Sequence, residues 1–193
     1  MSSEAFETDK QKAIAFAAFE VFAEHGFRKT SMQLIAKKAG MSRPALYLHF
    51  QSKEDVFGYL SVDFFKKIQV QVETVLAAQL GPVETLQGVF DAFDPDSVMK
   101  ILLDAEHGGE LLDVKVSSAY AQVDDIMTNI RLSLTEWLRA QAAQGKILCD
   151  DPLETGQTIM ASYYGLKSPP PSYAAYKTRV AQLATLLGRG LSA

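Results

Sequence analysis

The chain has 193 residues, of which 48% are hydrophobic and 22% are charged, and its formal net charge is −4. This balance is that of an ordinary globular protein and excludes a disordered or fibrous chain. No apolar run approaches the length that crosses a membrane, the N-terminus has no signal-peptide pattern, and Cys149 has no second cysteine with which to pair. We therefore expect a cytoplasmic protein with no membrane contact.

The first part of the chain predicts four helices. The sequence from Thr8 to Gln11 fits a capping box, which favours a helix that starts at Thr8 and ends at Gly26. Gly40 allows a sharp reversal between two short helices, and Ser52 can cap the helix that follows. The expected helices run from 8 to 26, from 30 or 31 to 40, from 42 to 50 and from 52 to 78.

Glycine and proline punctuate the rest of the chain, where the apolar spacing is again helical. The prolines at 82 and 152 favour helix starts, and His107-Gly108-Gly109 predicts a loop. The proline run within 168–171 predicts a linker. The expected helices run from 82 to 93, from 117 to 144, from 151 to 166 and from 172 to 188. A further helix is expected between the first two of these, with its C-terminus near 106. No stretch shows the alternation of a β-strand, so we predict an all-α fold.

Positive charge is concentrated between Glu24 and Glu54. This stretch holds six Lys or Arg residues and no Asp or Glu, although the chain as a whole is acidic. It also holds the two short helices joined through Gly40, which is the pattern of a helix-turn-helix. A solvated, lysine-rich surface would not need that turn or that spacing. A basic helix-turn-helix in an acidic chain indicates local contact with DNA.

The residues of this stretch resemble those of one family. The segments 39–42, 45–47 and 49–54, which read AGMS, ALY and HFQSKE, are similar to the DNA-binding domain of the tetracycline-repressor (TetR) family. The resemblance covers about the first third of the chain. It implies a three-helix domain over 8–68, with its helix-turn-helix at 31–50. A long fourth helix would join this domain to a larger ligand-binding and dimerisation domain over 69–193.

The resemblance also implies contacts with the phosphates of double-stranded operator DNA. Tyr47 and Lys53 occupy positions at which the family binds phosphate, and the start of the fourth helix favours an anion near Lys53. Thr30 or Ser31 is expected to make a similar contact at the start of the second helix.

Base contacts are expected from the recognition helix. Arg43 can pair bidentately with guanine, and Pro44 and Ala45 can touch thymine methyl groups. Gln33 either reads bases or completes a capping box with Thr30, and His49 either reaches phosphate or is partly buried. The predicted DNA-binding residues are Thr30, Ser31, Gln33, Ser42, Arg43, Pro44, Ala45, Tyr47, His49 and Lys53.

The second half is rich in aromatic side chains, most of them at the spacing of a helical core. A ligand pocket needs a few polar groups among them. His107 lies between two glutamates but has no second His or Cys near it, so we expect neither a metal nor a cofactor. The candidate ligand-binding residues are Phe64, Phe90, Met99, His107, Tyr120, Trp137 and Tyr163.

Apolar stripes on the last two helices predict a four-helix bundle between two copies of the chain. Alternatively, the same stripes cover their own domain. The candidate dimer-interface residues are Leu153, Gly156, Met160, Tyr163, Tyr176, Val180, Leu183 and Leu187.

These features predict a ligand-responsive regulator, and most simply a dimeric repressor that a small-molecule effector releases from a palindromic operator. An enzyme is not expected, because the chain has no Gly-rich phosphate loop, no Gly-x-Ser-x-Gly and no metal-ligand cluster. Two alternatives stay open: an architectural protein that tolerates many DNA sequences, and a family member that a protein partner controls.

Overall fold

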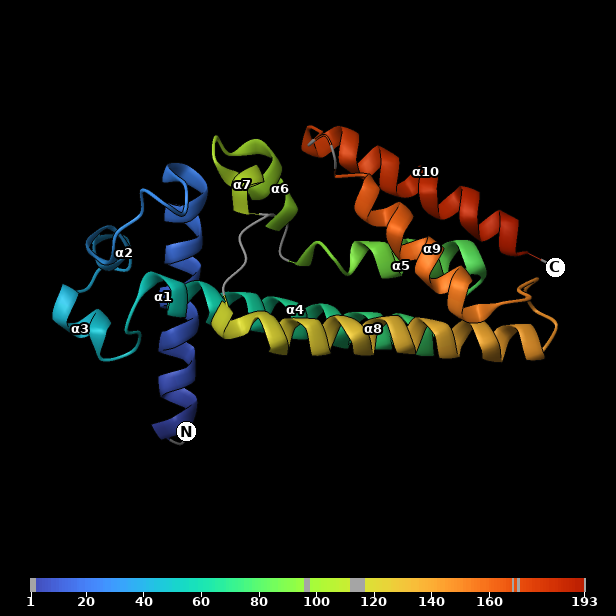
Figure 1. The fold of residues 1–193 in the computed structure, drawn as a ribbon, viewed down its shortest axis with the longest axis horizontal. Coiled ribbons are helices and arrows are strands. Elements are labelled where there is room, and N and C mark those ends of the chain that lie inside the picture. Colours follow the sequence, from blue (N-terminus) through green and yellow to red (C-terminus); the bar gives the residue numbers. More distant parts are fainter. Residues whose placement is uncertain (1–2, 96–97, 112–116, 168, 170, 193) are drawn as a thin grey trace. The chain divides into compact units, whose positions relative to one another are not determined.

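The computed structural model describes residues 3–95, 98–111, 117–167, 169 and 171–192 (Figure 1). These residues form helices joined by short loops and no strand beyond one isolated bridge, which confirms the all-α prediction. No helix in this described part is long and apolar enough to cross a bilayer. The helices are α1 (Ser3–His25), α2 (Met32–Lys38), α3 (Arg43–Tyr47), α4 (Lys53–Ala77), α5 (Pro82–Asp91), α6 (Val98–Asp104), α7 (Gly108–Leu111), α8 (Ser117–Ala143), α9 (Pro152–Gly165) and α10 (Tyr173–Leu191).

The chain divides into two compact units, and the first comprises Met1–Phe64 and Lys100–Val123. Its core joins α1, α2, α3 and the start of α4. Phe22, Phe27 and Phe57 pack ring against ring, with centroids 5.1–5.7 Å apart. Ile35 and Leu46 are fully buried beside them. This small aromatic and aliphatic core fixes α2 and α3 against α1.

The second unit comprises Phe65–Met99 and Asp124–Ala193. In it α10 lies beside α9 and α5 (Figure 1). The α5–α10 contact is close, because a Cβ atom at Gly188 would lie 2.5 Å from the Cα atom of Val83. Only a glycine lets the two helix backbones approach to this distance. Leu86, Phe90 and Val180 fill the core around the contact.

Most of the predicted helix starts are confirmed by side-chain caps. Ser42, Asp151 and Ser172 each accept a backbone N–H of the helix that follows. At α4 the cap is reciprocal, since Asp55 N–H donates to Ser52 Oγ and Asp55 Oδ2 accepts from Gln51 N–H. These predictions succeed because a cap depends on a few neighbouring residues.

Three predicted boundaries are wrong. Helix α1 begins at Ser3, so Thr8 lies inside the helix and cannot be its cap. A short helix, α7, stands where the sequence predicts a loop, and Gly108 there is buried with the Leu102 carbonyl oxygen 2.5 Å from the position of a Cβ. Helix α10 continues through Gly188 to Leu191, because packing on α5 outweighs the low helix propensity of glycine. Residues 168 and 170 of the predicted linker lie outside the described residues.

Two glycines of α10 provide a matched test of the α5–α10 contact. We expect Gly188→Ala to lower the free energy of unfolding by about 1–3 kcal/mol, because the added methyl group overlaps the Val83 backbone. Gly190→Ala is the control, since nothing lies within 4 Å of its Cβ position. The control should raise stability by about 0.5–1 kcal/mol through helix propensity. Urea denaturation of both variants measures the difference, and equal stabilities would contradict the packing argument.

Candidate nucleic-acid interface

Helices α2 and α3 are held at a sharp turn that leaves α3 on the surface. Gly40 takes the left-handed conformation, with φ of +66°, which a residue with a side chain rarely adopts. Ser31 Oγ accepts the N–H of Leu34, and Ser42 Oγ accepts the N–H of Ala45, each at 3.3 Å. Leu46 points inward and is fully buried. The other sides of α3 are thereby free to meet a partner.

The exposed face of α3 carries a preorganised pair. Arg43 Nη2 donates to Tyr47 Oη at 3.3 Å, and the guanidinium carbon lies 5.5 Å from the centre of the Tyr47 ring. The two residues are four apart, so they share one side of the helix. Leu48, directly after α3, is 83% exposed. This surface offers a forked cation, a phenol and apolar groups, which are the elements of DNA-groove contact.

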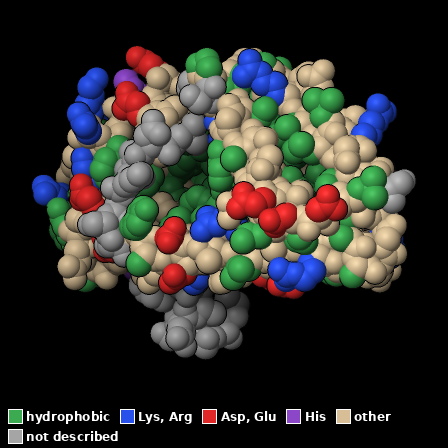
Figure 2. Space-filling model, turned by 45° about the vertical axis from the view of Figure 1, so that its right-hand side comes forward, with side chains coloured by type: hydrophobic (Ala, Val, Ile, Leu, Met, Phe, Trp, Pro, Cys, Tyr) green, Lys and Arg blue, Asp and Glu red, His purple; other side chains and the backbone are tan. Residues whose placement is uncertain are grey.

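The sequence between Glu24 and Glu54, which contains this face, has no acidic residue. One of its lysines forms an ion pair with a glutamate of α1. Lys38 Nζ lies 3.2 Å from Glu20 Oε2 of α1, whereas Lys37 is exposed. The face of the molecule in Figure 2 carries charges of both signs. Acidic side chains gather near its middle, with Lys and Arg interspersed around them. An excess of basic over acidic side chains is therefore local to the helix-turn-helix stretch, since the chain as a whole is acidic.

Thr30 turns inward, and this excludes the capping-box interpretation of Gln33. Its side chain is 3% exposed and donates to the Gly26 carbonyl oxygen at 2.9 Å. The cap of α2 is Ser31, so the predicted capping box between Thr30 and Gln33 is wrong. Gln33 is exposed on α2. Of the Thr30–Ser31 pair, only Ser31 presents its hydroxyl at the surface.

The Lys53 ammonium is hydrogen-bonded to the backbone of its own chain. Its ammonium donates to the carbonyl oxygens of Phe27, Arg28 and Thr30 at 2.8–3.0 Å, and it lies 4.9 Å from the centre of the Phe27 ring. A lysine ammonium has three hydrogens, and all three are used. Lys53 thus ties the start of α4 to the turn between α1 and α2, and reaching a phosphate would break one of these bonds.

The predicted DNA-binding residues therefore fall into three groups. Most are exposed around α2 and α3, a few are half-buried, and one is in the core. The exposed residues are Ser31, Gln33, Ser42, Arg43, Pro44 and Tyr47, the half-buried ones are Ala45, His49 and Lys53, and the buried one is Thr30.

The predicted ligand-binding residues are divided between the two units. Phe90, Met99, Trp137 and Tyr163 are buried in the second unit, whereas Phe64, His107 and Tyr120 belong to the first. Tyr120 is 55% exposed. The backbone N–H of His107 donates to the Ala23 carbonyl oxygen at 3.1 Å, and its Nδ1 lies 3.0 Å from Glu110 Oε1. This places His107 at the end of α1, and the described residues contain no group of side chains arranged to hold a metal ion.

Aromatic rings form the centre of the second unit. Phe90 stacks on Tyr163 with centroids 5.1 Å apart, and Phe93 lies 5.0 Å from the same ring. The Tyr163 and Tyr176 hydroxyl oxygens are 2.7 Å apart. Burial raises the pKa of Tyr176 to about 12 and also raises the pKa of Tyr163. Both phenols therefore keep their protons at neutral pH.

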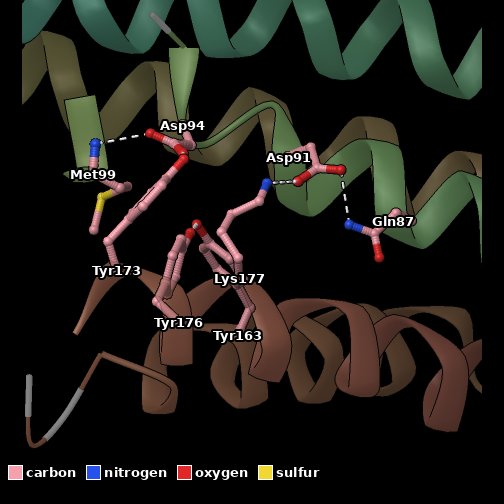
Figure 3. A network of polar contacts seen from close by, with 8 residues as sticks. All are labelled: Gln87, Asp91, Asp94, Met99, Tyr163, Tyr173, Tyr176 and Lys177. Atoms are coloured by element: carbon pink, nitrogen blue, oxygen red, sulfur yellow. Dashed lines mark hydrogen bonds and ion pairs between the residues drawn. The ribbon is translucent and has the colours of Figure 1, made fainter. Parts of the chain in front are cut away.

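Two carboxylates tie α10 to the segment that contains α5 (Figure 3). Asp94 accepts from the Tyr173 hydroxyl and from the Met99 backbone N–H, each at 2.8 Å. Asp91 accepts from Lys177 Nζ at 2.5 Å and from Gln87 at 2.7 Å. Each carboxylate oxygen of both residues accordingly has a donor, which fixes the register of α10.

Lys167 is a residue that the sequence analysis missed. Its ammonium lies 4.6 Å from the centre of the Tyr163 ring and 5.8–5.9 Å from those of Tyr164 and Phe93. Burial lowers the pKa of Lys167 to about 8, and the negative charge of Asp94 opposes this shift. The only signal in the sequence is a lone lysine between an apolar helix end and a proline run, and such a lysine is usually solvated.

The predicted dimer stripe is mostly buried inside the chain. Five of the eight residues are in the core, namely Gly156, Met160, Tyr163, Tyr176 and Val180, while Leu153 is 49% exposed and Leu183 and Leu187 are half-buried. A Cβ at Gly156 would lie 3.1 Å from Thr135 Oγ1 of α8, which shows what covers this face. The stripe thus covers its own unit. Apolar residues on the exposed faces are Leu153 and Tyr164 of α9 and Leu186 of α10.

Comparisons with known proteins agree with this architecture. Residues 14–60 match the model of the family described as bacterial regulatory proteins, tetR family. The transcriptional repressor KstR2 of Mycobacterium tuberculosis is 36% identical over 75 residues, which are 39% of this chain but only 38% of that protein. A TetR/AcrR-family regulator of Thermobifida fusca shares the fold, with a TM-score of 0.75 and 20% identity over 94% of this chain and 98% of that one.

A second solved structure, AibR in complex with isovaleryl coenzyme A and operator DNA, has a TM-score of 0.65 at 19% identity. The match covers 93% of this chain and 97% of the AibR chain. Residues 14–60 therefore belong to the tetR family of bacterial regulatory proteins, and the chain shares the fold of solved members of that family. The proteins that it resembles are transcriptional regulators and not enzymes.

Lys53 can be tested apart from DNA. We expect Lys53→Met to lower the free energy of unfolding by about 2–4 kcal/mol, because three carbonyl groups lose their donor and two of these hydrogen bonds are partly buried. Lys37→Met is the control, since Lys37 is exposed on α2 and should change stability by less than about 0.5 kcal/mol. Urea denaturation provides the measurement. If both variants were equally stable, Lys53 would not hold the turn.

The lowered pKa of Lys167 predicts that the free energy of unfolding depends on pH in the alkaline range. The pKa is about 8 in the folded chain, below the ordinary value of 10.5. The unfolded chain therefore binds more protons between these values, and stability rises with pH through that window. Lys167→Met should raise the free energy of unfolding at pH 7 by about 1–2 kcal/mol, and this gain should shrink toward about pH 9.5.

The control for Lys167 is Lys146→Met, because Lys146 is an exposed lysine of the same unit. Urea denaturation of the wild type and both variants at the two pH values measures the effect. A loss of stability in Lys167→Met at neutral pH would show that the ammonium is favourably placed.

Proposed function

We propose that this protein is a transcriptional repressor that binds a palindromic operator as a homodimer and leaves it when a small molecule binds. The observation that carries the proposal is the exposed pair of Arg43 and Tyr47 on a basic helix-turn-helix. Arg43 reads guanine in the major groove, and the Tyr47 hydroxyl binds a neighbouring phosphate. Ser31, Gln33, Ser42 and Pro44 complete the contact surface.

DNA binding and effector binding belong to different parts of the chain, with the boundaries that the sequence predicts. Residues 8–68 read DNA, and residues 69–193 bind the effector and the partner subunit. KstR2, a repressor by name, supports the repressor assignment. AibR, which was solved with both isovaleryl coenzyme A and operator DNA, supports control by a small molecule.

Dimerisation sets the distance between the two recognition helices. Binding to successive major grooves needs the two α3 helices roughly 34–36 Å apart. The exposed apolar side chains Leu153, Tyr164 and Leu186 form the pairing surface, because the inner stripe is already buried. Helix α4 contributes residues to both units and is the lever that changes the spacing. An effector that shifts the dimer from 1:99 to 99:1 must prefer one state by roughly 5.5 kcal/mol.

Fluorescence anisotropy with DNA from upstream of the protein's own coding region tests the proposal. Arg43→Ala should weaken specific binding by about 1–3 kcal/mol and relax the base preference at one position of each half-site. Tyr47→Phe should weaken binding to all sequences alike. Arg139→Ala, which removes an exposed arginine of α8, is the matched control and should leave binding unchanged.

Scrambled DNA and a salt series complete the experiment. Specific binding should be lost on scrambling, with two protomers bound per operator. Binding that is indifferent to sequence and equally affected by both arginine variants would favour the architectural alternative instead.

A further inference from the structure

The half-buried ammonium of Lys167, in the second unit, has no anionic partner among the residues that the structure describes. Lys167 follows Leu166, the C-cap of α9, and its ammonium faces the rings of Phe93, Tyr163 and Tyr164 at 4.6–5.9 Å. We call these four residues the Lys167 cage. Among the residues that the structure describes, none accepts a hydrogen bond from this ammonium or forms an ion pair with it. Ring faces attract a cation, but they return only part of the hydration that burial removes.

The nearby carboxylates are already engaged. Asp94 acts on Lys167 through its charge, but its oxygens accept from Tyr173 and from the Met99 backbone (Figure 3). Asp91 is held by Lys177 and Gln87. Neither can turn toward the cage without giving up its own donors. The cage therefore keeps an excess of positive charge, which a bound anion would compensate.

A second donor adjoins the cage. The hydroxyl groups of Tyr163 and Tyr176 are 2.7 Å apart, and one of them donates to the other. A pair of phenols has two hydrogens, so one O–H is not used within the pair. Both residues are almost completely buried. The surroundings of Lys167 thus combine an ammonium, a pair of hydrogen-bonded phenols and three aromatic faces.

We propose that the Lys167 cage binds the carboxylate of a small organic acid, that the apolar body of the acid lies against the aromatic rings, and that this acid is the effector. The last clause rests on the proposed function. A single ammonium matches a single negative charge. A phosphate dianion fits less well, because the cage has no arginine and lies beyond the C-terminal end of α9, where the helix dipole disfavours negative charge.

Isothermal titration calorimetry with the purified full chain tests the site. The probes are benzoate, phenylacetate and octanoate, each paired with its neutral amide. We expect at least one acid to bind about tenfold or more tightly than its amide, as a charge-assisted contact requires. Lys167→Met should abolish this preference, and the exposed-lysine control Lys146→Met should keep it. Equal binding of acid and amide, no binding of any acid, or a preference that survives in Lys167→Met would overturn the proposal.

A second measurement separates the site from the proposed function. The acid that binds is added to the wild-type protein on its operator DNA in the anisotropy experiment. Release of the DNA, at concentrations that match the calorimetric affinity, supports the effector role. Binding of the acid without release would overturn that role. Failure of the wild type to bind any operator would overturn the proposed repressor, while calorimetry would still decide whether the cage binds acids.

Discussion

The three hydrogen bonds of the Lys53 ammonium are the constraint on which the exposed surface of the helix-turn-helix depends. They join the first turn of α4 to the carbonyl groups that follow α1. The same turn carries Thr30, whose hydroxyl is bonded to Gly26, and it leads directly into the Ser31 cap of α2. With the turn fixed at both ends, the buried Leu46 determines which side of α3 faces outward. The position of Arg43 therefore depends on contacts that Lys53, Thr30 and Leu46 make within the chain.

Local rules account for much of this fold, and long-range contacts account for what they miss. The caps at Ser42, Ser52, Asp151 and Ser172 were predictable because each depends on residues within one helical turn. The short helix α7 and the end of α10 were not. Gly108 lies against the Leu102 carbonyl, and Gly188 against the Val83 backbone. Glycine in a sequence signals freedom to turn, but it does not distinguish a turn from a close approach of two helices.

In the candidate site, too, some features follow from local sequence and others depend on long-range contacts. An exposed Arg43 and Tyr47 follow from their spacing on a short helix, whereas the roles of Thr30 and Lys53 depend on carbonyl groups that only the folded chain brings near them. The apolar stripes of α9 and α10 were recognised, but a stripe indicates that a face is buried and not what buries it. Here the chain's own α8 covers Gly156.

Two lysines of this chain differ in the number of hydrogen-bond acceptors around their ammonium groups, and this difference determines whether burial stabilises the fold. Lys53 and Lys167 are both half-buried and both lie against aromatic rings. Lys53 has three carbonyl acceptors, so its charge is satisfied and the residue stabilises a turn. Lys167, within the described part of the chain, has only ring faces, so its burial is a net cost to the fold. A chain tolerates such a cost most readily at a site where a ligand supplies the missing partner, because stability and binding then depend on the same group.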